Sequence, residues 1–369
     1  MHLHPYFFWG QKMYYGDYLK LDQLLSAQQL ESEKKGRYAH DEMLFIVVHQ
    51  AYELWFKQML HEIDSIIDVF KQNPVEEKHL FTANSRLDRV VKIQKLILEQ
   101  IDIMETMTPM DFLEFRDLLV PASGFQSVQF RELEIKLGLS TKRRFQVDQK
   151  YFTGRLSEDD QNKVHSYEKT ENILDLLEAW LERIPFVKTQ DFDFWQEYQK
   201  VIDDLITTDE DIIKAHNQGD ELKAELKRLE STKQTFASLF DEDIHQQMLE
   251  KGDRRMSREA LLSALFILLY RDEPILYQPF ELLTHLMNID EQITTWRYKH
   301  AMMAHRMLGS KIGTGGSSGH QYLKNTTSHN RVFIDLFNLS TFLIPRSKLP
   351  KLPEHLIKKL NYHFNHEDL

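Results

Sequence analysis

Cysteine is absent from this 369-residue chain, and its absence removes several kinds of site at once. Without a thiolate the protein can form no disulfide, no cysteine-ligated zinc or iron–sulfur site and no thiolate-ligated haem. Any bound metal would have to rest on His, Asp, Glu, Tyr or Met side chains. Glycine and proline are also scarce, with 13 and 10 residues, which is about half their usual combined share of ~12%. This scarcity disfavours a turn-rich all-β fold, so we expect an all-α protein.

Basic residues are fewer than acidic ones: the chain has 46 Lys and Arg residues and 57 Asp and Glu residues, which gives a net charge of −11. No basic stripe is present, so no nucleic acid partner is expected. The N-terminus lacks the basic and apolar regions of a signal peptide. The most apolar run, Ala260–Tyr270, is much shorter than the ~20 residues of a membrane span. We therefore expect a soluble, cytoplasmic protein with no membrane partner.

Apolar residues recur at three- and four-residue steps through most of the chain, which predicts amphipathic helices packed as an antiparallel bundle. The first helix is expected from Asp41 to about Phe70, and a second is marked by apolar residues from Leu87 to Met104. A third is expected to start near Met110. Further helices are expected at Gln126–Leu137, Asp159–Arg183, Asp191–Ile206, Gly219–Phe240, Ser257–Tyr270, Pro279–Leu286 and Asp290–Leu308.

The middle of the chain, roughly residues 140–255, is richer in charged residues and has narrower apolar stripes. We interpret it as a helical insertion within a single domain that spans residues 1–369. A separately folding second domain is the weaker alternative, because no repeat of fixed period and no Pro/Ser-rich linker divides the chain.

Two histidines lie in apolar, aromatic surroundings. His49 follows Phe45 by four residues, so both side chains project from one helix face. That pattern fits a structural core histidine as well as the wall of a binding pocket. His300 and His305 are five residues apart and diverge by about 140° on a helix, so they cannot chelate one ion as a pair. A lone imidazole at His300 suits the axial position of a haem, although such surroundings are also typical of plain core.

The only glycine-dense stretch, residues 309–319 (GSKIGTGGSSG), fails both phosphate-binding motifs, so nucleotide binding is not expected. Its backbone and hydroxyl groups, including that of Thr314, could close over a small polar ligand, but an exposed linker fits equally. Arg116 follows Phe112 by four residues and is expected to share its helix face. Its guanidinium would pair either with an internal carboxylate or with that of an amino-acid substrate.

Together these segments resemble the tryptophan 2,3-dioxygenase family. The resemblance is carried by YGDYL at 15–19, HDEMLFIVVHQAYELWFK at 40–57, residues 111–131, RDEP at 271–274, residues 296–319 and DLFNLS at 335–340. It implies a helical-bundle haem-dioxygenase fold assembled as a homotetramer, with one haem b per subunit that is ferrous in the active state. It also implies that L-tryptophan and O2 are converted to N-formyl-L-kynurenine, the first step of the kynurenine pathway.

The resemblance further assigns roles to the residues that match its motifs. His300 matches the proximal haem ligand, His49 the histidine beside the oxygen site, and Ser123 and Gly124 a segment near the haem. His49 is expected to position groups by hydrogen bonding rather than to act as an obligatory base. Within the substrate site, Arg116 matches the carboxylate clamp and Thr314 matches the partner of the ammonium group. An N-terminal arm, about residues 1–38, matches a segment that reaches the site of a neighbouring subunit. The other residues that match the substrate site are Phe45, Ile46, Val47, Val48, His49 and Phe112, together with Tyr15, Tyr18 and Leu19 on the arm.

Two positions depart from the family pattern. Position 320 is His where many members carry Tyr, and position 112 is Phe where some carry Tyr, which removes one hydroxyl from the pocket. Two other functions stay open. A related histidine-ligated haem enzyme could hydroxylate another aromatic amino acid. A helical scaffold or haem sensor would keep the bundle, but it would not need Phe45, His49, Arg116 and Thr314 together.

Overall fold

The computed structural model describes residues 13–72, 74–139, 154, 156–185, 187–188, 192–309 and 330–361. Within these residues the secondary structure is helical, and the only β pairing is an isolated bridge between Lys188 and Asp193. The prediction of an all-α protein is confirmed. Among the described helices, none is both long and apolar enough to cross a bilayer.

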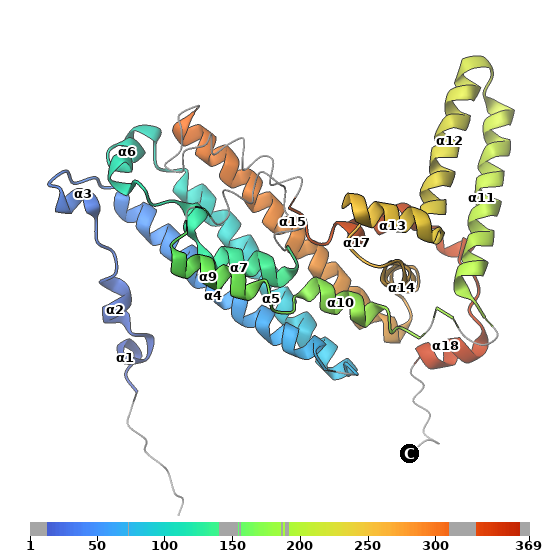
Figure 1. Cartoon of the computed structure of the whole chain (residues 1–369), viewed down its shortest axis with the longest axis horizontal. Coiled ribbons are helices and arrows are strands. Elements are labelled where there is room, and N and C mark those ends of the chain that lie inside the picture. The colour runs from blue at the N-terminus through green and yellow to red at the C-terminus, as the bar shows by residue number, and fades with distance from the viewer. Residues whose placement is uncertain are drawn as a thin grey trace, which may run out of the picture.

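Four helices form the bundle that carries the candidate site: α4 (Glu42–Phe70), α5 (Glu77–Met104), α7 (Val128–Leu137) and α15 (Pro274–Leu308). They lie side by side in Figure 1, with α5 packed against both α4 and α15. The helices pack because each presents a stripe of apolar residues to the others, as Met59, Ile63 and Ile66 do from α4 with no exposed surface.

Three short helices precede the bundle: α1 (Tyr15–Leu19), α2 (Leu21–Leu25) and α3 (Glu31–Lys34). Figure 1 shows α1 and α2 extending away from the bundle. The buried carboxylate of Glu42 ties α3 to the start of α4, since it accepts hydrogen bonds from the backbone N–H groups of Glu31 (2.8 Å) and Ser32 (3.0 Å). The arm is thus fixed where it joins the bundle.

The remaining elements follow the same helical pattern. Figure 1 shows α11 and α12 as a hairpin that projects from the rest of the molecule. Their bounds are α6 (Pro109–Leu113), η1 (Arg116–Leu119), η2 (Gly124–Gln126), α9 (Glu158–Tyr167), α10 (Ile173–Leu181), α11 (Phe194–His216), α12 (Gly219–Phe240), α13 (Glu242–Lys251), α14 (Arg258–Leu269), α17 (Ile334–Asn338), η4 (Leu339–Phe342), η5 (Arg346–Lys348) and α18 (Glu354–Leu360).

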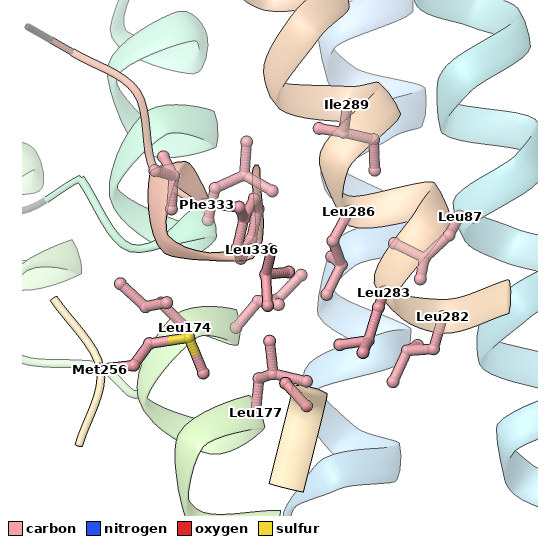
Figure 2. Close-up of a cluster of buried hydrophobic side chains, with 14 of the residues drawn as sticks. Leu87, Leu174, Leu177, Met256, Leu282, Leu283, Leu286, Ile289, Phe333 and Leu336 are labelled. Carbon is pink, nitrogen blue, oxygen red and sulfur yellow. The ribbon is translucent and has the colours of Figure 1, made fainter. Parts of the chain in front are cut away.

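The charged middle of the chain shares the core of the bundle. Leu174 and Leu177 of α10 and Met256 lie in the same buried cluster as Leu286 of α15 and Leu336 of α17 (Figure 2). Truncating one such leucine to alanine typically costs about 2–5 kcal/mol. The middle segment therefore contributes directly to the stability of the bundle.

Several predicted boundaries are wrong. The helix predicted at Asp159–Arg183 is two helices, because the chain turns after α9 and Asn172 caps α10 by accepting a hydrogen bond from the Asp175 N–H (3.0 Å). The two helices predicted at Pro279–Leu286 and Asp290–Leu308 are one, α15, which begins at Pro274 and contains Pro279. In addition, α11 runs on to His216, beyond its predicted end at Ile206, while α13 was not predicted.

Candidate active site

His49 lies on α4 with one nitrogen already engaged. Its Nδ1 lies 2.7 Å from the carbonyl oxygen of Phe45, and because a carbonyl can only accept, Nδ1 carries the proton. Burial lowers the pKa of His49 below its usual value, and the Phe45 carbonyl and Glu53 oppose this only in part. His49 is therefore a neutral imidazole whose Nε2 is left with a lone pair.

The Phe45 ring forms an aromatic wall with its neighbours. Its centroid lies 4.1 Å from the His49 ring, 5.8 Å from Phe112 and 5.6 Å from Phe115, which it meets edge-on. Phe112 belongs to α6, which starts with a capping box between Thr108 and Asp111. The structure thus brings together Phe45, His49 and Phe112 as the sequence predicts.

Arg116 is placed differently from the prediction. It does not share a helix with Phe112, because α6 ends at Leu113 and Phe115 leaves the helical conformation (φ −127°, ψ −8°). Arg116 instead begins the 3-10 turn η1, directly after the fully buried Phe115. Because Phe115 packs in the aromatic wall, it restrains the backbone of the next residue, Arg116, whose side chain is half-buried.

His300 lies on α15, one turn after Trp296, and the two ring centroids are 5.1 Å apart. Burial, and to a lesser extent the neighbouring His49, lowers the pKa of His300 to about 4, so the imidazole is neutral near pH 7. Its Nδ1 is buried and has no hydrogen-bond partner among the described residues. Histidines on two different helices thus face a common region, whereas His305 is exposed to solvent.

Tyr52 and Trp296 connect the two histidine-bearing helices. Tyr52 lies one turn after His49 on α4, and its ring meets those of His49 and Trp296 edge-on at 6.2 and 6.0 Å. Burial raises the pKa of Tyr52 to about 12, so its hydroxyl stays protonated. Sequence reasoning missed both residues, although their spacing of three or four residues from the histidines was a usable signal.

Ile46 and Val47 point away from the helix face that carries Phe45, whereas Val48 lies within about 60° of Phe45. Successive residues on an α-helix are separated by about 100°, so His49, four residues on, lies closest to Phe45 around the helix. Val48 is buried in the core, Ile46 is half-buried, and the Val47 side chain is 45% exposed.

Ser123 and Gly124 lie in the connection between α6 and α7. The Ser123 hydroxyl caps η2 by accepting a hydrogen bond from the Phe125 N–H (3.4 Å). Gly124 is exposed, and a Cβ atom added there would meet nothing within 4 Å. This connection therefore leaves open space beside the backbone.

Three further predicted positions lie on the N-terminal arm. Tyr15, Tyr18 and Leu19 lie on α1, where the two tyrosines are about 70% exposed, and Figure 1 places α1 away from the bundle. Thr314 and His320 lie outside the described residues.

Within the described part of the chain, no three His, Asp or Glu side chains gather in a way that could hold a metal ion. A haem needs less from the protein, because the porphyrin supplies four of the iron ligands and one imidazole completes the site. His300 fits that requirement, being a buried, neutral imidazole among aromatic rings. The donor set therefore suits an axially ligated haem.

Comparison with known proteins agrees with this chemistry. The family described as "Tryptophan 2,3-dioxygenase" matches residues 8–343. A protein named tryptophan 2,3-dioxygenase from Alteromonas mediterranea is 51% identical over 95% of this chain and 97% of its own length. Proteins of the same name from Bdellovibrio bacteriovorus and Dictyostelium discoideum are each 47% identical over 95% of this chain, and over 99% and 88% of their own lengths.

Proposed function

Because the chain belongs to the tryptophan 2,3-dioxygenase family, we propose that it adds both atoms of O2 across the indole C2–C3 bond of L-tryptophan and releases N-formyl-L-kynurenine. This reaction is the first step of tryptophan degradation by the kynurenine pathway, and we assign it to the cytoplasm. The observation that carries the proposal is the pair of neutral histidines, on α4 and α15, beside the Phe45–Phe112 aromatic wall.

His300 would hold one haem b per subunit, and Ser123 and Gly124 would lie near it. When bound in its ferrous form, the haem supplies the iron that activates O2. The contribution of the chain is a neutral imidazole that Trp296 packs against, so its orientation is restrained.

The substrate would be held at its two ends. Phe45 and Phe112 present an apolar wall for the indole, and Arg116 presents a forked cation that matches a carboxylate. Thr314 is assigned to the substrate ammonium group. Fixing both ends of the molecule restricts it to the orientation in which its C2–C3 bond can react.

His49 serves as a positioning group in this proposal. Its Nδ1–H is held by the Phe45 carbonyl, so Nε2 is the atom that can accept a hydrogen bond from the indole N–H. Ile46, Val47 and Val48 contribute to the substrate site through the packing of α4 rather than as part of the wall.

The oligomeric state and the domain division belong to the same proposal. The exposed Tyr15, Tyr18 and Leu19 would enter the site of a neighbouring subunit in a homotetramer, as an arm of about residues 1–38. The whole chain, residues 1–369, would act as one domain in which residues 140–255 are an insertion.

A substrate comparison tests the activity. The haem-loaded, anaerobically reduced protein is mixed with L-tryptophan or L-tyrosine, O2 is admitted, and the haem spectrum and product mass are recorded. A spectral change and a product two oxygen atoms heavier are expected with L-tryptophan only. Hydroxylated tyrosine would support the related hydroxylase, and haem binding without any product would support the sensor.

A further inference from the structure

A small cavity lies between α4, α5, α7 and α15, and Trp296 in its lining is one helical turn from His300. The volume of the cavity is about 10 Å³. This is close to the volume that one water molecule requires. Its lining is mostly apolar and includes Phe56 of α4, Gln94 of α5, Phe130 of α7, and Gln292 and Trp296 of α15.

Two polar atoms of this lining are buried without a partner. Gln94 is 3% exposed, and its Nε2 donates to the Ile289 carbonyl (3.3 Å), which fixes the orientation of the amide because that carbonyl can only accept. Gln94 Oε1 and Trp296 Nε1 have no hydrogen-bond partner among the described residues. Since buried polar groups are rarely left unpaired, an acceptor and a donor beside the same cavity point to a ligand that pairs with both.

We propose that this cavity binds one structural water molecule, which accepts a hydrogen bond from Trp296 Nε1–H and donates one to Gln94 Oε1. The second hydrogen of the water is available to Gln292. Water is favoured over an apolar guest because the site is roomy enough for only one small molecule and carries complementary polar groups.

The water would connect α5 to α15 at the turn before His300. It would hold the Trp296 indole, which packs against the His300 ring at 5.1 Å between centroids. Trp296 would then be a positioning residue for His300. The existence of the water site does not depend on what His300 binds.

The alternative partner of the Trp296 N–H is the hydroxyl of Tyr52. The two rings meet edge-on at 6.0 Å, and the nearby Trp296 N–H opposes the rise of the Tyr52 pKa. However, no hydrogen bond of normal geometry joins them. A direct bond between these two side chains is therefore the outcome that competes with the bridging water.

The experiment uses full-length protein and ultraviolet resonance Raman spectroscopy of the indole N–H band that responds to hydrogen bonding. Subtracting the spectrum of Trp296→Phe isolates the Trp296 signal from those of the other tryptophans. Gln94→Met keeps the side-chain length but removes the acceptor, and we expect it to shift the band toward a free N–H. Tyr52→Phe is the matched control and should leave the band in place.

A shift caused by Tyr52→Phe alone, or by neither variant, would overturn the proposal. A crystal structure of the unaltered protein provides a second test that needs no variant to fold. It should show density for one water within hydrogen-bonding distance of Gln94 Oε1 and Trp296 Nε1, and an empty cavity would refute the assignment.

Discussion

At the scale of the residue, this site is organised by neutral imidazoles. Burial lowers the pKa values of both His49 and His300, so each offers a lone pair near pH 7 rather than a charge. A lone pair on His300 is what an iron ligand needs, and one on His49 is what a hydrogen-bond acceptor needs. The roles we propose for both residues follow from this shared property.

Replacing His300 with Ala should abolish stable haem binding, because the replacement leaves the iron without its protein ligand. The measurement is the ratio of haem to protein absorbance after gel filtration. Added imidazole should restore part of the haem content by occupying the vacated position, and His305→Ala should retain haem. Normal haem content in His300→Ala would contradict the assignment.

Replacing Arg116 with Met should weaken substrate binding by roughly 10- to 100-fold, which corresponds to the ~1.5–3 kcal/mol of a charged hydrogen bond. The raised KM should come with a smaller change in kcat. Tryptamine, which lacks the carboxylate, is the control substrate. The preference for L-tryptophan over tryptamine should largely disappear in the variant, and an unchanged preference would exclude Arg116 as the clamp.

At the scale of the element, residue spacing predicts what lies along one helix but not what meets across two. The spacing of Phe45 and His49 predicted their shared face on α4, and the contact between the two rings, with centroids 4.1 Å apart, confirms it. The contact between Tyr52 and Trp296 joins helices far apart in the sequence, so no local pattern could reveal it. The start of α15 was predicted too late because a proline normally begins or interrupts a helix, whereas Pro279 lies in its second turn, and the predicted break before Asp290 is absent.

The junction of α7 and α10 should tolerate no side chain at Gly138. Its φ is +128°, and an added Cβ would lie 2.5 Å from the Leu174 Cβ. Gly138→Ala should therefore destabilise the protein by roughly 1–3 kcal/mol more than Gly252→Ala, whose φ is +78° but whose surroundings are open. Urea denaturation of both variants measures the difference. Equal midpoints would contradict the prediction, because they would show that the protein can accommodate the contact between the new Cβ atom and Leu174 without loss of stability.

The loop after α13 should lose stability in mild acid. The buried His245 donates from Nε2 to the Met256 carbonyl (3.0 Å), while burial first and then Arg254 lower its pKa. A histidine with a lowered folded-state pKa binds fewer protons than in the unfolded chain, so stability falls as the pH drops below about 6.5.

His245→Gln is the matched variant, because its amide can donate to the same carbonyl but does not titrate. Urea midpoints at pH 7.5 and 5.5 should therefore decrease less in His245→Gln than in the unaltered protein. An identical decrease in both would exclude His245 as a contributor.

At the scale of the whole molecule, the N-terminal arm leaves large aromatic side chains exposed to solvent. Tyr15 and Tyr18 are about 70% exposed on α1, where large aromatic side chains gain nothing from packing. Residue patterns alone did not predict what this arm packs against, and only the family resemblance suggested a neighbouring subunit. Assembly would bury these residues and supply them to another site.

Complementation between subunits tests the arm. Tyr18→Ala and Arg116→Met should each lower activity in homogeneous assemblies. Coexpression of the two chains should restore about a quarter of the sites, namely those that combine an intact Arg116 with the intact arm of a neighbour. Activity no higher than the average of the two variants would show that the arm serves its own chain.

The central claim is that both atoms of one O2 molecule enter the indole ring of L-tryptophan. The most direct measurement is mass spectrometry of the product formed by haem-loaded protein under ¹⁸O2 in unlabelled water, analysed before exchange with solvent. The account predicts N-formyl-L-kynurenine that carries two labelled oxygen atoms. A product with one labelled atom, or with none, would contradict it.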